Sequence, residues 1–145
     1  MQAVTCSIAR EVDVYVAIGR GCELAQAIGF GEIDRTRIEI VILELSRNIL
    51  VHAGSGTLLL EPVQDDRRRG MVVEARDSGP GIPDISLAMR DGYSTANTLG
   101  AGLPGVKRLM DAFEITSEAG SGTRVKAIKW LDERQAKRSR GGLQP

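Results

Sequence analysis

A carboxylate and an amide four residues apart, Glu44 and Asn48, form the first pair whose spacing suits chemistry. In a helix such residues are neighbours on one face, with about 5–6 Å between their Cβ atoms. The carboxylate can act as a base or orient a hydroxyl or a water. The amide oxygen can give Mg²⁺ one ligand, with phosphates and waters supplying the others. A polar pair on a helix surface explains the same residues, so this pair alone decides nothing.

Asp77 precedes two closely spaced glycines in the stretch DSGPGIPD, residues 77–84. At the end of a strand its carboxylate can accept a hydrogen bond from an exocyclic amine such as that of adenine. Gly79 and Gly81 would let a flat ring approach the backbone, although an ordinary strand-to-loop turn also explains Asp-x-Gly. Thr123, in GSGTRV, is either a plain strand threonine or a hydroxyl that closes the same base pocket.

Gly100, Gly102 and Gly105 surround Pro104 where an amphipathic helix is expected to begin. A tight turn with Pro104 at the first helical position is one interpretation. The other is an anion site, because uncovered backbone N–H groups and the positive end of a helix dipole favour phosphate. A glycine cluster alone is weak evidence for either interpretation.

The elements that must position these residues are predicted from apolar periodicity and capping residues. Asp13 and Asp34 are expected to cap two long helices. In the second of these, Ile38, Ile42, Leu45 and Ile49 form a core stripe, and His52 packs near the helix end. Helices are predicted over residues 13–28, 34–53, 84–90 and 103–113, strands over 3–9, 54–63, 70–79, 113–119 and 122–131, and a long loop over 91–102.

Strands that come in hairpins and helices that cluster predict an α/β fold, a two-layer sandwich whose mixed or antiparallel sheet is covered on one face by helices. A doubly wound nucleotide fold would need strict alternation instead. We expect residues 1–131 to form a single domain and residues 132–145 to form a polar, flexible tail. Only 3% of the residues are aromatic, so Leu, Ile and Val must fill the core.

The charge balance gives no sign of a nucleic-acid or membrane partner, since 19 Lys and Arg residues face 19 Asp and Glu residues. No apolar run approaches the ~18 residues of a membrane span, and no basic-then-apolar leader opens the chain. We therefore expect a cytoplasmic protein. Cys6 and Cys22 lack metal-ligand spacing and are expected to be buried or idle thiols.

Each motif is ambiguous alone, but their order is informative. Glu44-x-x-x-Asn48, Asp77-x-Gly79-x-Gly81, Gly100-x-Gly102 and Gly120-x-Gly122-Thr123 together resemble the N, G1, G2 and G3 boxes of the GHKL ATPase/kinase superfamily. More narrowly, ELSRNI, DSGPGIPD, DGYST, LGAGLPGVKRLMD and AIKWL are similar to the stressosome switch serine/threonine kinases, relatives of the anti-sigma-factor kinases. One departure is Pro104, which stands where many superfamily members have a third glycine.

The resemblance implies a Bergerat-type ATP-binding fold and an ATP-dependent serine/threonine protein kinase. Adenine would lie against Asp77, Gly79, Gly81 and Thr123, with Mg²⁺ on Asn48 and Glu44 as the catalytic carboxylate. Residues 91–102 would form the lid over ATP, and Gly100, Gly102 and Gly105 would serve the phosphates.

The same resemblance implies STAS-domain scaffold proteins as substrates. It also implies partner switching in a stress response, in which the kinase then activates a downstream phosphatase. Two alternatives stay open: an anti-sigma-factor binding module, and a stand-alone ATPase in which Glu44 activates water.

Overall fold

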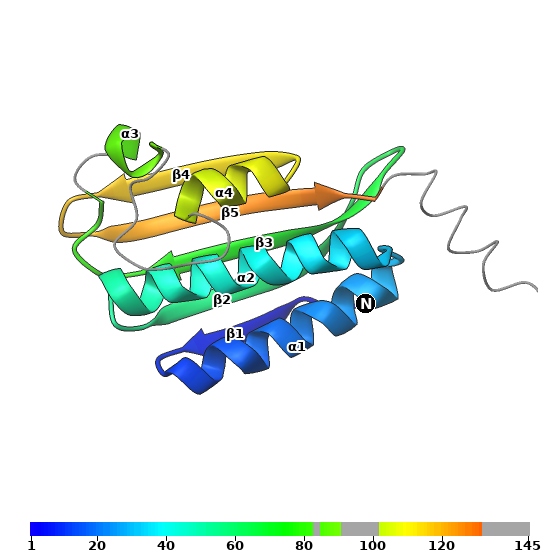
Figure 1. Cartoon of the computed structure of the whole chain (residues 1–145), viewed down its shortest axis with the longest axis horizontal. Coiled ribbons are helices and arrows are strands. Elements are labelled where there is room, and N and C mark those ends of the chain that lie inside the picture. Colours follow the sequence, from blue (N-terminus) through cyan, green and yellow to red (C-terminus); the bar gives the residue numbers. More distant parts are fainter. Residues whose placement is uncertain (83–84, 91–101, 132–145) are drawn as a thin grey trace, which may run out of the picture.

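The computed structural model of the chain describes residues 1–82, 85–90 and 102–131. Its elements in chain order are β1 (Val4–Ile8), α1 (Glu11–Ile28), α2 (Glu32–His52), β2 (Gly56–Gln64), β3 (Arg69–Asp77), α3 (Ile85–Ala88), α4 (Gly102–Leu109), β4 (Ala112–Glu118) and β5 (Gly122–Trp130). The strands form one sheet in the order β1-β2-β3-β5-β4, and each neighbouring pair is antiparallel. Helices α1, α2 and α4 lie on one face of this sheet (Figure 1). The predicted two-layer α/β sandwich is confirmed.

The core lies between the sheet and these helices. Alternate residues of β2 and β3, among them Leu58, Leu60 and Val73, point towards the helices and are fully shielded from solvent. The predicted stripe of α2 packs against them, and its four residues Ile38, Ile42, Leu45 and Ile49 are at most 1% exposed. A core filled by aliphatic side chains is what the low aromatic content requires.

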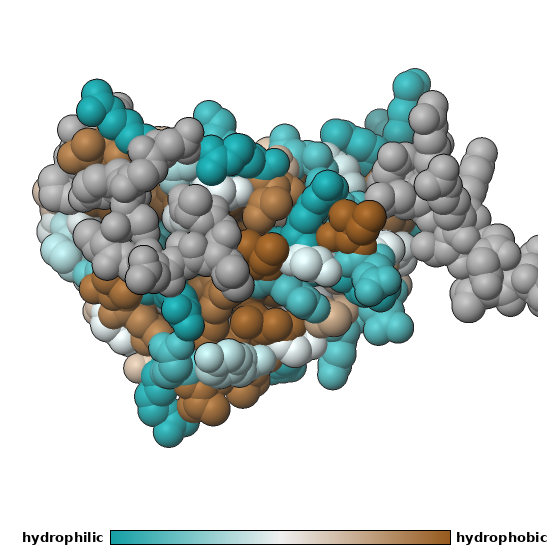
Figure 2. All heavy atoms as spheres, in the orientation of Figure 1, coloured by the Kyte–Doolittle hydropathy of each residue, from teal (hydrophilic) through white to brown (hydrophobic). Residues whose placement is uncertain are grey.

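The outward side of the helical layer is mixed in character. Apolar residues (brown) and polar residues (teal) are interspersed over it (Figure 2). The exposed large apolar side chains include Val12, Tyr15 and Val16 of α1. Among the described residues, no helix combines the length and the apolar character needed to cross a membrane. Cys6 is buried, Cys22 is partly buried, and both are free thiols.

The opposite face of the sheet carries a charged cluster around Glu74. The Glu74 Oε1 atom accepts a hydrogen bond from Arg124 Nε at 2.9 Å and another from Arg76 Nε. Burial would raise the pKa of Glu74, but the hydrogen bonds and charges of Arg124 and Arg76 outweigh it and hold the pKa below the usual 4.5. Glu74 is therefore an ionised group that is almost completely buried.

Helix α1 begins at Glu11, two residues before the predicted cap. Asp13 does serve the helix end, but from inside the first turn. Its Oδ2 atom accepts hydrogen bonds from the backbone N–H groups of Ala9 and Arg10, both at 2.9 Å. The carboxylate thus satisfies the backbone donor of the N-cap residue Arg10 and that of the residue before it.

The prediction that Asp34 caps α2 is wrong. The helix begins at Glu32, and Asp34 is buried within its first turn. There Asp34 Oδ1 lies 2.9 Å from Arg37 Nη1 and 3.8 Å from Lys129 Nζ. The carboxylate is used to join α2 to β5 rather than to end a helix.

Helix α4 is shorter than the predicted 103–113, because it ends at Leu109. The Asp111 N–H donates to the Ile128 carbonyl at 2.9 Å, and the Asp111 carboxylate accepts from the Trp130 N–H at 2.7 Å. These two bonds draw the chain into the sheet, so Phe113 belongs to β4.

Candidate functional site

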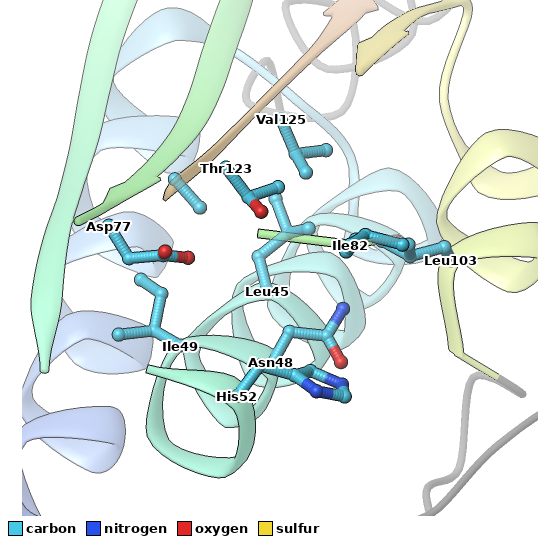
Figure 3. Close-up of a pocket in the computed structure, with 10 residues that line it drawn as sticks. Leu45, Asn48, Ile49, His52, Asp77, Ile82, Leu103, Thr123 and Val125 are labelled. Atoms are coloured by element: carbon cyan, nitrogen blue, oxygen red, sulfur yellow. The ribbon is translucent and has the colours of Figure 1, made fainter. Parts of the chain in front are cut away.

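A pocket of about 330 Å³, counted with its open mouth, lies at the end of the molecule where α2 and β3 end and β5 begins (Figures 1 and 3). Asn48, Asp77 and Thr123 come from three separate sequence motifs, and all three lie in its wall. The complete lining is Leu45, Asn48, Ile49, His52, Ala75, Asp77, Ile82, Leu103, Thr123 and Val125.

Asp77 is placed by the sheet and by its own turn. It is the last residue of β3 and pairs in register with Thr123 of β5. Its Oδ1 atom accepts the Gly79 N–H at 3.0 Å, which closes a turn at the strand end. This contact fixes the carboxylate, which points towards the pocket (Figure 3).

Gly79 and Gly81 allow the segment after β3 to pack closely against the rest of the protein. A Cβ at Gly79 would come within 2.6 Å of the Ala53 Cβ. Gly81 has a φ of +82°, and a Cβ there would overlap the Glu118 carbonyl oxygen. The space beside both glycines is thus filled by protein atoms, and their contact with a base remains a prediction.

The Thr123 hydroxyl belongs to a small network of hydrogen bonds. It lies 3.0 Å from Ser117 Oγ, which stands opposite it on β4. Ser117 Oγ accepts the Ile82 N–H at 2.7 Å and lies 3.2 Å from the Gly122 carbonyl oxygen. Sequence reasoning missed Ser117, because only the register of β4 against β5 shows that it faces Thr123.

Helix α2 supplies Asn48 and His52, one turn apart, to the pocket. The sequence analysis expected His52 to pack near the helix end. It is the last residue of α2, and its exposed side chain also lines the pocket mouth. The spacing of four residues from Asn48 was the signal that could have found it.

Glu44 lies one turn before Asn48 on the same helix, yet it is not among the lining residues. Its side chain is fully shielded from solvent. The sequence analysis left open a polar pair on the helix surface, and the structure places the Glu44 side chain in the buried interior instead. Its catalytic role remains a prediction.

The glycines predicted to serve phosphates are only partly described. Gly102 begins α4 with a φ of +71°, and both Gly102 and Gly105 are buried. Leu103, between them, lines the pocket. Gly100 and residues 91–101 of the predicted lid lie outside the described residues.

The chemistry of the lining suits a flat apolar ring that carries a hydrogen-bond donor. Aliphatic side chains form most of the wall, and Asp77 is the one carboxylate among the lining residues named above. In the described part of the chain, no three His, Cys, Asp or Glu residues are arranged to hold a metal ion. A nucleotide-bound Mg²⁺ needs few protein ligands, because phosphates and waters supply most of its coordination. The side-chain oxygen of Asn48 is therefore a suitable single ligand.

Comparison with known proteins agrees with this fold. The profile of the histidine kinase-like ATPase domain matches residues 9–129. The chain therefore belongs to the histidine kinase-like ATPase domain family, as the GHKL resemblance predicted.

Among its relatives is the serine/threonine-protein kinase RsbT of Bacillus subtilis (strain 168). The two are 51% identical over 124 residues, which cover 86% of this chain and 93% of that protein. The solved structure of the mycobacterial sensor histidine kinase MprB aligns with a TM-score of 0.53 and 17% identity. That alignment covers 89% of this chain and 96% of the other, and at this identity it shows the fold alone.

Proposed function

We propose that this chain transfers the γ-phosphoryl group of ATP to a serine or threonine of a STAS-domain scaffold protein. The enzyme class, a serine/threonine-protein kinase, follows from the 51% identity with RsbT over most of both chains, and the class predicted from sequence is confirmed. The observation that supports this pocket as the ATP site is the meeting of Asn48, Asp77 and Thr123 in one cavity.

The adenine end of ATP is assigned to the part of the pocket between β3 and β5. Asp77 accepts a hydrogen bond from the exocyclic amine, and Thr123 closes the pocket beside it. Ile49, Ile82 and Val125 cover the faces of the ring. The segment that carries Gly79 and Gly81 packs closely on β4 and keeps Asp77 in place.

The phosphate end is assigned to Asn48 and to the glycines around the start of α4. Asn48 would hold Mg²⁺ through its side-chain oxygen, and the bound ion would neutralise phosphate charge. Gly100, Gly102 and Gly105 bring backbone N–H groups to the phosphates, and Gly102 already has a conformation that favours glycine.

Glu44 is proposed to act on the serine or threonine hydroxyl that accepts the phosphoryl group. In the transfer, the hydroxyl oxygen bonds to the γ-phosphorus as the bond to the β-bridging oxygen breaks, and ADP leaves. Glu44 orients the hydroxyl or takes its proton. Its side chain is fully shielded from solvent, and Asn48, one turn further along α2, is the nearer of the two to the pocket because it lines the wall. Positioning and charge, rather than covalent chemistry, supply most of the rate in such transfers.

The proposal includes a switch of partners. Phosphorylation adds about −1.5 to −2 charges at neutral pH, and this charge weakens the complex with the scaffold. The released kinase then binds and activates a downstream phosphatase in stress signalling, in the cytoplasm. We assign the kinase activity to residues 1–131 as one domain and treat residues 132–145 as a tail.

The direct test is transfer of label from [γ-³²P]ATP with Mg²⁺ to a STAS-domain scaffold protein. Wild type should label serine or threonine, while Glu44→Gln should bind ATP with unchanged affinity and transfer at least a hundredfold more slowly, since a general base contributes roughly 10²–10⁴-fold. Arg47→Gln, three residues further along α2, serves as the control. Its partly buried side chain pairs with Glu11 at 3.1 Å and does not line the pocket, so transfer should be retained.

Two results would reject the kinase. ATP binding without transfer to any scaffold would favour the binding module, which a pull-down of a sigma subunit would then identify. Phosphate released at full rate without an acceptor would favour the stand-alone ATPase. Transfer at the wild-type rate by Glu44→Gln would remove Glu44 from the catalytic role.

A further inference from the structure

Ser117 holds together three parts of the pocket wall. It stands opposite Thr123, which in turn stands opposite Asp77, so the three residues form one row across β4, β5 and β3. Within the described part of the chain, the Oγ atom of Ser117 has three neighbours at hydrogen-bond distance: the Ile82 nitrogen, the Gly122 carbonyl oxygen and the Thr123 hydroxyl.

We propose that Ser117 is the positioning residue that makes the Thr123 hydroxyl an acceptor towards the pocket, so that the site selects adenine over guanine. The inference rests on the proposed function, because it assigns base selection to the same ATP pocket.

The argument is a count of hydrogens. A serine hydroxyl has one hydrogen to donate and can accept two. The Ile82 N–H, 2.7 Å away, uses one acceptor site. If Ser117 donates to the Gly122 carbonyl at 3.2 Å, the Thr123 hydroxyl donates to Ser117 at 3.0 Å, and all three contacts are hydrogen bonds.

The opposite arrangement loses a bond. If Ser117 donates to Thr123, its oxygen has no hydrogen left for the Gly122 carbonyl, and two acceptors face each other at 3.2 Å. The first arrangement therefore prevails, and Thr123 presents only lone pairs to the pocket.

Asp77 and Thr123 then act as two neighbouring acceptors. The amino group of adenine supplies hydrogens to such a site, whereas guanine places a carbonyl oxygen at the same position of the ring. Two acceptors that face a carbonyl are left unsatisfied once the base covers them, which lowers affinity roughly fivefold to a hundredfold.

Ser117 also anchors the segment after β3. Besides the Ile82 N–H bond to Ser117, the Gly120 N–H donates to the Pro80 carbonyl at 2.9 Å. Both bonds tie this segment to the β4–β5 hairpin, so loss of the Ser117 hydroxyl loosens one of its two attachments and frees Thr123 to rotate.

The experiment measures dissociation constants of ATP and GTP for wild type and variants by calorimetry, with Mg²⁺ present. Wild type should prefer ATP at least tenfold. Ser117→Ala should bind ATP several-fold more weakly and narrow the ATP-to-GTP preference at least fivefold. Ser117→Thr retains the hydroxyl and should restore the preference. Thr116→Ala, the exposed neighbour on the same strand, should equal wild type.

Two further measurements separate positioning from mere stabilisation. At saturating ATP, kcat of Ser117→Ala should stay within twofold of wild type. Thr123→Val should reduce the preference for ATP over GTP by as much as Ser117→Ala does. The double variant, with both substitutions, should show no further reduction. If Ser117→Ala fails to fold, Thr123→Val alone still tests the proposal.

If Ser117→Ala lost ATP and GTP affinity equally and kept the preference for ATP, the proposal would be overturned. Ser117 would then have only a structural role. A Thr123→Val variant with wild-type preference would overturn it as well. If wild type itself binds no ATP, the proposed function fails, a result visible before any variant is compared.

Discussion

Gly120 and Gly122 show how a single Cβ atom can decide the geometry of the pocket. Both have a positive φ, +80° and +103°, which costs an ordinary residue about 1 kcal/mol. A Cβ at Gly120 meets nothing within 4 Å, whereas a Cβ at Gly122 would overlap the Asp77 carbonyl oxygen. The pair therefore separates backbone strain from a collision.

We expect Gly120→Ala to lower the free energy of unfolding by about 1 kcal/mol, the strain of a left-handed residue. Gly122→Ala adds the collision, so it should lose roughly 3 kcal/mol or more and displace Asp77. Urea unfolding of the two variants measures the difference. Equal losses would show that the close approach at Gly122 is absent.

A second prediction concerns the side chain of Asp77 and its effect on ATP affinity. In Asp77→Asn the amide can place a donor where the amine of adenine needs an acceptor. ATP affinity should therefore fall at least tenfold, in line with the roughly 1.5–3 kcal/mol typical of a hydrogen bond to a charged group. Asp66→Asn, an exposed residue of the β2–β3 turn, is the control. Calorimetric titration with ATP gives both values, and unchanged affinity of Asp77→Asn would reject its assignment to the base.

Among the elements, the central strands and helices were predictable and their ends were not. The apolar stripe of α2 is a local pattern, and its four residues are buried where the sequence predicted. Strands β2 and β3 also largely fall in segments that were predicted as strands. Asp34 looks like a helix cap in sequence, but Lys129, 95 positions later in the chain, takes its carboxylate into an ion pair. Such partners depend on the fold, so local reasoning cannot find them.

The charged cluster around Glu74, on the face of the sheet opposite the helices, makes the free energy of unfolding depend on pH. The folded-state pKa of Glu74 is lowered, so its contribution is complete above the unfolded value near 4.5 and is lost as the pH falls through the folded value. Glu74→Gln should cost roughly 1–2 kcal/mol at pH 7, a reduced figure because Arg76 is largely in solvent.

Urea unfolding of wild type and Glu74→Gln from pH 7 to pH 3 tests this dependence. The gap between the two should shrink below pH 4.5, because the wild type loses the charge that the variant lacks. Glu61→Gln, exposed on the neighbouring strand β2, is the control. A gap that stays constant over this range would contradict the role of the charge.

At the scale of the whole molecule, the pocket exists because distant segments end at the same place. Asn48, Asp77 and Thr123 are separated by 29 and 46 positions in the chain, and the antiparallel order β2-β3-β5 beneath α2 brings them together. The motif order assigned these three residues to one site, and their contact with ATP stays a prediction. The contribution of Ser117 depends on the register of β4 against β5, which the sequence does not state, whereas the spacing of four residues from Asn48 could have pointed to His52.

The central claim is that this pocket binds ATP. Two-dimensional amide NMR of the ¹⁵N-labelled chain, titrated with ATP and Mg²⁺, tests it most directly. We expect the largest shift changes at Gly79, Ile82, Thr123 and Asn48, and none at Asp65–Arg68 in the β2–β3 turn at the far end of the sheet. Changes confined to other surfaces, or no change at millimolar ATP, would contradict the account.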